Sequence, residues 1–283
     1  IRTVNDSPRV TGLVVNSSEA RVDSCVFRHN IATPLKLEYG GGVITRNKIY
    51  ANSNRLQEQT GNGGGINVYS DKKVRVEENE VYENEAHGGR DGGGGIYAFA
   101  YNGGDVRVVN NTVRDNVSDK KAGGIFAYDA RIIGNRVFDN RAGWEGGGIY
   151  AIQAELTENT VTGNTAPGGG GVYSRECLLR KNLIRKNRAQ DGSGLYHEGD
   201  GRMTGNTLVE NECPEPLGCA TIVLSGNPEM QHNNIIASDG YALKYKSHSL
   251  SPDLQAIDNF WGSADNDTIE HLISDWLEDS EVG

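Results

Sequence analysis

Short runs in which apolar and polar residues alternate follow one another along nearly the whole chain. In the segments "VRVEEN" (74–79) and "AELTEN" (154–159), apolar residues occupy every second position. This period of two is typical of a strand that buries one face. Glycines and asparagines separate the runs at intervals that leave no room for a helix, so the pattern predicts short strands joined by turns.

A repeated phrase punctuates these runs. The pattern Asn-x-(Val/Ile/Leu)-x-x-Asn occurs at residues 47–52, 79–84, 111–116, 135–140, 159–164, 182–187 and 206–211. Successive copies begin 32, 32, 24, 24, 23 and 24 residues apart. A glycine phrase keeps step with it, as in "GGGI" at 63–66, 93–96 and 146–149. Two phrases that share one period predict a repeat architecture.

Three short strands and three turns in each unit fit one coil of a parallel β-helix. We therefore predict an all-β solenoid of about nine to ten coils over residues 1–264. Equivalent residues of neighbouring coils would then lie about 4.8 Å apart, which is the strand spacing of a sheet.

The second asparagine of each phrase is predicted to be structural. Asparagine tolerates the left-handed backbone conformation that a sharp corner needs. Stacked asparagines can also hydrogen-bond between coils, which satisfies their buried polar groups. The predicted ladder consists of Asn52, Asn84, Asn116, Asn140, Asn164, Asn187 and Asn211. The alternative is a row of ligands. The glycines are predicted at tight corners and at close backbone contacts.

One helix is predicted, over residues 265–279 after the last coil and in the same domain. Asp267 can cap it, with Glu270 three residues later as in a capping box. Its apolar stripe consists of Ile269, Leu272, Ile273, Trp276 and Leu277. An amphipathic helix of this kind would cover the open end of the stack.

Charge narrows the range of partners. The formal net charge is −10, which argues against a nucleic acid or anionic lipid, because both attract clustered positive charge. No apolar run reaches the roughly 20 residues of a membrane-spanning helix. The opening "IRTVNDSPRV" lacks a signal-peptide pattern, so we expect a processed product. Its first coil has no cap before Val10, and we expect a partner or a missing segment to cover it.

The cysteines favour an oxidising compartment. Cys213 and Cys219 bracket the short loop "CPEPLGC", which suits a local disulfide. Cys25 and Cys177 fall at repeat positions that are otherwise apolar or asparagine, so buried free thiols are expected there.

With these repeats the chain resembles bacterial secreted right-handed parallel β-helix proteins, the pectate-lyase-like class, over about residues 10–278. The glycine phrase paired with "FRHN" (27–30) is also similar to the passenger repeats of polymorphic outer-membrane adhesins. "DNFWG" (258–262) looks like the end of many secreted β-helix chains. The resemblance implies a right-handed coil and an extracellular, cell-surface or periplasmic location. It covers polysaccharide lyases, hydrolases and epimerases as well as non-catalytic adhesins.

Motifs for catalysis are sparse. The paired aspartates of the related hydrolases and the triplet "GHG" are both absent. A lyase needs a basic residue beside groups that neutralise a uronate. The best basic cluster is Lys181, Arg185, Lys186 and Arg188. It is either a surface for an acidic polymer or a solvated face. No cofactor and no metal site are predicted, although Asp265 and Asp267 leave calcium open.

An aromatic residue follows the glycine phrase in five successive coils. These residues are Tyr97, Phe126, Tyr150, Tyr173 and Tyr196. Equivalent positions should stack into a column, and the rings should point outward if the preceding residue points inward. The column is either a flat binding strip for sugar rings or a protein, or a structural stack. His197, beside Glu198 and near Asp200, is a further candidate for chemistry.

The period lengthens at residues 53–62, 85–92, 101–105 and 117–122, where we expect loops that could form a cleft. These loops carry His87, Arg90, Asp91, Tyr101, Asp119, Lys120 and Lys121.

Two functions are open. The first is a non-catalytic extracellular module that binds a glycan or a surface protein, or that forms part of a surface assembly. The second is a polysaccharide lyase or epimerase that acts on uronate-containing glycans. The regular coils and the missing catalytic motifs favour the first.

Overall fold

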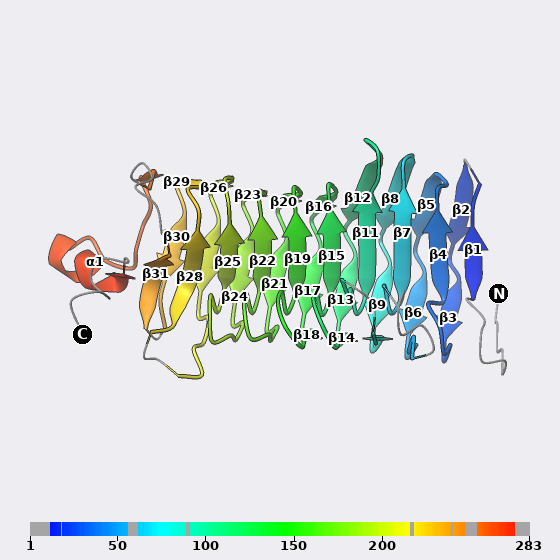
Figure 1. Cartoon of the computed structure of the whole chain (residues 1–283), viewed down its shortest axis with the longest axis horizontal. Coiled ribbons are helices and arrows are strands. Elements are labelled where there is room, and N and C mark those ends of the chain that lie inside the picture. The colour runs from blue at the N-terminus through cyan, green and yellow to red at the C-terminus, as the bar shows by residue number, and fades with distance from the viewer. Residues whose placement is uncertain are drawn as a thin grey trace.

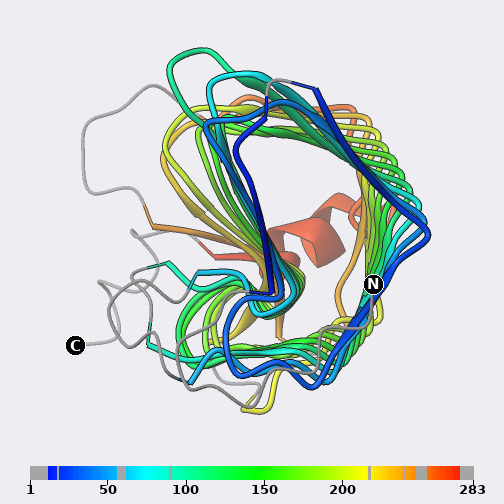
Figure 2. The same cartoon turned by 90° about the vertical axis from the view of Figure 1, so that its right-hand side faces the viewer.

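The computed structural model describes residues 12–17, 19–55, 62–88, 91–215, 218–238, 240–246 and 254–274. Within these residues the strands of successive coils pair in parallel, each with its equivalent in the next coil (Figure 1). Viewed along the stack, the coils superpose around one axis (Figure 2). The fold is a right-handed parallel β-helix, which confirms the predicted fold class.

Each coil contributes one strand to each of three long sheets. Sheet A contains β1 (Leu13–Val15), β4 (Leu35–Glu38), β7 (Ile66–Ser70), β11 (Ile96–Ala100), β15 (Ile125–Tyr128), β19 (Ile149–Ile152), β22 (Val172–Arg175), β25 (Leu195–Glu198), β28 (Ala220–Ser225), β31 (Tyr241–Tyr245) and β33 (Ile273–Ser274). Sheet B contains β2 (Ala20–Asp23), β5 (Gly42–Thr45), β8 (Lys73–Glu77), β12 (Asp105–Val109), β16 (Arg131–Ile133), β20 (Glu155–Thr157), β23 (Leu178–Arg180), β26 (Arg202–Thr204), β29 (Glu229–Gln231) and β32 (Ala256–Ile257).

The third long sheet follows sheet B in every coil except that of β32. Sheet C contains β3 (Val26–Arg28), β6 (Lys48–Tyr50), β9 (Glu80–Tyr82), β13 (Thr112–Arg114), β17 (Arg136–Phe138), β21 (Thr160–Thr162), β24 (Leu183–Arg185), β27 (Thr207–Val209) and β30 (Asn234–Ile236). A short sheet D contains β10 (Glu85–Ala86), β14 (Val117–Ser118) and β18 (Arg141–Ala142). Sheet D lies on the path from sheet C back to sheet A.

The core lies between sheets A, B and C. In the coil of β19, β20 and β21, the inward residues Ile149, Leu156 and Val161 are at most 1% exposed. The strand register pairs apolar residues of neighbouring coils, since Ile149 pairs with Ile125 on one side and with Val172 on the other. Alternation therefore directs an apolar residue inward from every strand, and each coil extends the same core.

The second asparagines form the predicted ladder inside the corner that follows sheet C. Asn140 Nδ2 donates to Asn164 Oδ1 at 3.0 Å, and Asn164 Nδ2 donates to Asn187 Oδ1 at 3.0 Å. The contact from Asn84 to Asn116 spans 32 residues and the contact from Asn116 to Asn140 spans 24, yet both bonds measure 3.0 Å. The structural role of these asparagines is confirmed.

The first asparagine of each phrase forms a second ladder, at the corner between sheets B and C. Its members are Asn47, Asn79, Asn111, Asn135, Asn159, Asn182, Asn206, Asn233 and Asn259, with Nδ2 to Oδ1 distances of 2.9–3.0 Å. Cys25 occupies the equivalent position in the first coil, and its N–H donates to Asn47 Oδ1 at 2.9 Å. Sequence reasoning missed this ladder, although its asparagines repeat as regularly as those of the first.

The expectation that ladder asparagines adopt the left-handed conformation is wrong. The residue before each of them turns the corner instead, as Asp139 (φ 55°) does before Asn140 and Glu158 (φ 56°) before Asn159. A ladder asparagine must direct its amide towards the neighbouring coils, so the strained backbone falls on the preceding residue, which faces solvent. Close backbone contact at the glycines is as predicted. A Cβ at Gly148 would lie only 2.7 Å from the carbonyl oxygen of Gly171.

The C-terminal helix α1 (Asn266–Leu272) is shorter than the predicted 265–279. Its cap is Asp265 rather than Asp267, because the Asp265 carboxylate accepts from the N–H of Thr268 at 3.2 Å. Ile273 is extended and opens β33, which pairs with β31. The polypeptide therefore returns to sheet A after two turns of helix. Trp276 and Leu277 lie outside the described residues.

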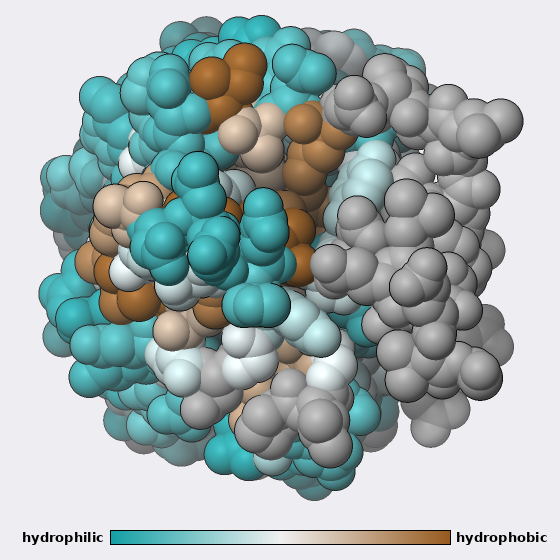
Figure 3. All heavy atoms as spheres, turned by 90° about the vertical axis from the view of Figure 1, so that its left-hand side faces the viewer, coloured by the Kyte–Doolittle hydropathy of each residue, from teal (hydrophilic) through white to brown (hydrophobic). Residues whose placement is uncertain are grey.

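The apolar side of α1 meets the end of the core. Ile269 and Leu272 of α1 and Ile273 at the start of β33 pack against the buried cluster. Figure 3 looks onto this end, where apolar residues are visible around polar ones. Ile257 and Phe260 of the last coil are about half exposed, so α1 covers part of the end.

The four cysteines form one disulfide and two free thiols. Cys213 and Cys219 form the predicted disulfide. Cys177 is a buried free thiol and Cys25 a half-buried one. No helix in the described ranges is long and apolar enough to cross a membrane.

Candidate functional site

The five predicted aromatic residues form a column on the outer face of sheet A. From Tyr97 to Tyr196, successive ring centroids are 4.7, 5.6, 4.9 and 4.9 Å apart, and the rings lie within 10° of parallel. Ile149 and Ala151, on either side of Tyr150, are fully buried in the core. The column and its outward direction are therefore as predicted.

The column is not a flat exposed strip. Tyr97, Phe126, Tyr150 and Tyr173 are only 2–4% exposed, and Tyr196 is half-buried. Because the ring faces stack on one another, each ring offers solvent only its edge, and the tyrosines offer their hydroxyls as well. Of the two alternatives, the geometry is that of the structural stack.

A second aromatic column, which sequence reasoning missed, lies two residues further along on β7, β11 and β15. Tyr69, Phe99 and Tyr128 stack with centroids 5.1 and 4.3 Å apart. The signal was the spacing of two between Tyr97 and Phe99, which places both rings on one face of a strand. The outer face of sheet A is thus a rigid aromatic floor.

A groove lies over the C-terminal half of this floor. Loops that lead from sheet C back to sheet A form its wall, and its volume is about 520 Å³. We call it the sheet A groove. Its main lining residues are Trp144, Glu145, Tyr173, Asp191, Tyr196 and Glu198. The two tyrosines pair in register on β22 and β25, so the floor is held by the sheet.

Trp144 is the most exposed aromatic side chain of the sheet A groove, at 52%. It stands in the segment "RAGWEGGG" (141–148), just after β18, and Lys120 Nζ lies 5.5 Å from the centre of its ring. Sequence reasoning missed it, although it is the only tryptophan before Trp261. Unlike the stacked tyrosines, it has a ring face that a ligand could cover.

Two of the lining carboxylates have ammonium partners. Lys121 Nζ lies 3.7 Å from Glu145 and donates to the Tyr150 hydroxyl at 2.9 Å. Lys246 Nζ lies 3.3 Å from Asp191 and 5.5 Å from the centre of the Tyr196 ring. Lys246 therefore covers the C-terminal end of the aromatic column.

Glu198 has no ion pair among the described residues. Burial raises the pKa of Tyr173, and a hydrogen bond with Glu198 raises it further. Burial is also the largest cause that raises the pKa of Tyr196, and the negative charges of Glu198, Asp191 and Glu145 raise it further. Both phenols stay protonated and can donate hydrogen bonds in a negative environment.

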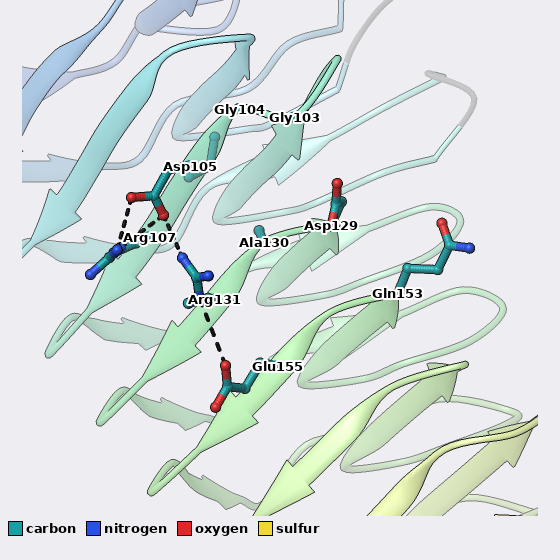
Figure 4. A pocket seen from close by; sticks show the side chains of 10 residues that line it. Gly103, Gly104, Asp105, Arg107, Asp129, Ala130, Arg131, Gln153 and Glu155 are labelled. Atoms are coloured by element: carbon teal, nitrogen blue, oxygen red, sulfur yellow. Dashed lines mark hydrogen bonds and ion pairs between the residues drawn. The ribbon is translucent and has the colours of Figure 1, made fainter.

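A second concavity, of about 500 Å³, lies on the outer face of sheet B (Figure 4). It exists because the long turn at Gly103 and Gly104 stands beside the tight corner of the next coil. Asp105 Oδ1 accepts from Arg107 Nε at 2.8 Å and from Arg131 Nη1 at 2.6 Å. The hydrogen bond from Arg107 holds the pKa of Asp105 below its usual range. The central charges of this recess are thus already paired with each other.

The comparisons with known proteins agree with this architecture. A family model described as "Right handed beta helix region" matches residues 3–166. The chain belongs to the right-handed β-helix family. No curated protein and no solved structure matches it.

The basic cluster of this β-helix lies away from the sheet A groove. Lys181 and Lys186 are the left-handed corner residues before two ladder asparagines. Arg185 lies on β24 in sheet C, and Arg188 lies 4.0 Å from Glu212 of the next coil. Lys181, Arg185 and Arg188 are absent from the lining of the groove, so the structure does not bring them together with the aromatic column.

Of the lengthened loops, 85–92 and 117–122 meet at His87. Its Nδ1 lies 2.8 Å from Asp119, and its Nε2 lies 3.0 Å from Glu85. Burial acts to lower the pKa of His87, but the hydrogen bonds with Glu85 and Asp119 outweigh it, and the pKa is raised. Tyr101 instead stacks against Tyr69 at 5.3 Å. Arg90 lies outside the described residues.

His197 points into the core of the β-helix, which rules out contact with a ligand on the surface. It is fully buried, and its Nδ1 lies 2.8 Å from Ser174 Oγ. Burial lowers its pKa to about 4. No three His, Cys, Asp or Glu side chains gather as a metal ion requires in the part of the chain that the structure describes. Asp265 caps α1, and calcium, which the sequence left open, is not tested by the structure.

Proposed function

We propose that this β-helix is a non-catalytic glycan-binding module and that the sheet A groove holds the glycan. The observation that carries the proposal is that exposed Trp144 shares one groove with the edges of Tyr173 and Tyr196. An indole face can cover the apolar face of a sugar ring, while carboxylates and phenols bind its hydroxyls. The disulfide supports an extracellular or periplasmic location.

A lyase or epimerase is the weaker proposal for this groove. Both reactions need a base beside a group that neutralises a uronate carboxylate. The lining holds three carboxylates and no arginine or lysine, so no feature of the groove favours that chemistry.

A glycan array followed by calorimetry tests the proposal. With a glycan found on the array, Trp144→Ala should weaken binding by about tenfold or more, which corresponds to ~1.4 kcal/mol. Phe260→Ala is the matched control, because Phe260 is similarly exposed at the far end of the stack. It should leave the affinity unchanged.

The same samples distinguish binding from catalysis. A binder returns the glycan at its original length, whereas a lyase produces shorter chains with ultraviolet-absorbing unsaturated ends. Absence of any bound glycan, or equal affinity of Trp144→Ala and the wild type, would refute the proposal. Shortened products would replace it with the enzyme alternative.

A further inference from the structure

All ionised side chains that line the sheet A groove are acidic. Glu145, Asp191 and Glu198 come from two loops and one strand, and all three act on the Tyr196 phenol. Three separate segments thus direct negative charge at one point of the floor. Lysines offset the charges of Glu145 and Asp191, so an anionic ligand would be repelled, and a cationic one attracted, mainly at Glu198.

Glu198 is the lining carboxylate that has acceptor positions left for hydrogen bonds to a ligand. Glu145 and Asp191 are each shared with a lysine, at 3.7 and 3.3 Å. Glu198 stands two residues after Tyr196 on β25, so both side chains project from the same face of the strand. It is half-buried and bonded to the Tyr173 hydroxyl. A carboxylate accepts up to about four hydrogen bonds, so acceptor positions are left for a ligand.

We propose that the sheet A groove selects glycans that carry free amino groups, an inference that rests on the proposed glycan-binding function. Glu198 accepts the hydrogen bonds of a sugar ammonium, and the half-buried Tyr196 ring lies beside it. Charge-assisted hydrogen bonds are the stronger kind, and aromatic rings add favourable cation–π contact. Uronate polymers are rejected for the same electrostatic reason.

Three oligosaccharides of equal length and β-1,4 or α-1,4 linkage test this inference by calorimetry: a glucosamine tetramer, the glucose tetramer cellotetraose, and a galacturonate tetramer. The measurements are made at mildly acidic pH, above the usual carboxyl pKa of about 4.3, where the sugar amines are protonated. The glucosamine tetramer should bind about tenfold or more tightly than cellotetraose. The galacturonate tetramer should bind most weakly. Added salt should reduce the preference.

Glu198→Gln should remove most of the preference for the glucosamine tetramer while binding of cellotetraose changes little. Glu210→Gln is the matched control. Glu210 belongs to the same coil, but it lies 3.6 Å from Lys186 and does not line the groove. Loss of one negative charge there should leave the preference intact.

The outcomes separate the inference from the proposed function. Equal binding of the glucosamine tetramer and cellotetraose, or an unchanged preference in Glu198→Gln, overturns the inference. If the inference fails in this way but the protein binds a neutral glycan and Trp144→Ala weakens that binding, the proposed function still stands. Tightest binding of the galacturonate tetramer also overturns the inference. If no glycan of the array binds, the proposed function itself fails.

Discussion

Replacing a central ladder asparagine should destabilise the protein far more than replacing a terminal one. Asn164 is fully buried. Its Oδ1 accepts from the backbone N–H of Asn140 at 2.9 Å and from the Nδ2 of Asn140 at 3.0 Å. Its own Nδ2 donates to Asn187 Oδ1, Val137 O and Thr162 O at 3.0–3.1 Å. Asn164→Ala therefore removes bonds to both neighbouring coils and leaves the N–H of Asn140 buried without an acceptor.

The size of the effect follows from these bonds. A stranded buried N–H costs about 1–3 kcal/mol, and each lost hydrogen bond about 1 kcal/mol. Bonds within one network are not additive, so the loss is smaller than the sum of these terms, and Asn164→Ala should lower the free energy of unfolding by roughly 3–5 kcal/mol. At the start of the ladder, Asn30 Nδ2 donates to Asn52 Oδ1 at 2.7 Å, and Asn52 Oδ1 also accepts from the backbone N–H of Asn30 at 3.0 Å. Asn30→Ala keeps that second bond, loses only the bonds from Asn30 Nδ2 to Asn52 Oδ1 and to Arg28 O, and should cost about 1–2 kcal/mol.

Urea unfolding followed by far-ultraviolet circular dichroism measures both variants, and hydrogen exchange adds a local readout. The amide of Asn140 should exchange much faster in Asn164→Ala and at the wild-type rate in Asn30→Ala. Equal destabilisation of the two variants, or an unchanged exchange rate at Asn140, would refute the reasoning.

Three further predictions concern single positions. Because the folded-state pKa of His87 is raised, its stabilising effect is complete below the unfolded-state pKa of about 6.5 and is lost as the pH rises through the folded value. His87→Gln should therefore lower the melting temperature at pH 5 to 6 and match the wild type at high pH, and an equal deficit at every pH would contradict this. His197, with its pKa lowered to about 4, makes the wild type lose stability as the pH falls from about 6.5 towards 4. In thermal unfolding over that range, the Ser174→Ala/His197→Leu variant should lack this loss, and an unaltered acid slope would count against it. Gly148→Ala, whose Cβ would meet a carbonyl oxygen at 2.7 Å, should be strongly destabilised in urea, whereas Gly168→Ala, with its nearest contact at 3.8 Å, should be nearly neutral.

The coils could be predicted because their signals are local and repeated. Ile149 and its equivalents alternate with polar residues, and the second asparagines recur at the corner after sheet C, so both the inward face and the ladder follow from period and chemistry. The left-handed residue was harder to place. Asp139 and Glu158 differ in type, and only the direction of the asparagine amide decides that the turn falls on the residue before it.

The groove could not be predicted in the same way, because it depends on how loops of different coils lie over one sheet. The aromatic column was visible as a pattern, but its burial depends on the loops that cover it. Trp144 and Asp191 are 47 positions apart in the sequence, and no periodicity connects them. The basic cluster was conspicuous as a run of residues, yet the ladder places Lys181 and Lys186 at corners away from the groove.

The hydrogen bond between ladder asparagines measures 3.0 Å whether 32 or 24 residues separate the partners. The spacing of the coils is therefore independent of how much polypeptide is inserted between them. Lengthening or exchanging a loop above the sheet A groove would alter the wall that a ligand meets while the floor beneath stays in place. In this fold, recognition can diversify at one rim while the stack loses only the small entropy of closing a longer loop.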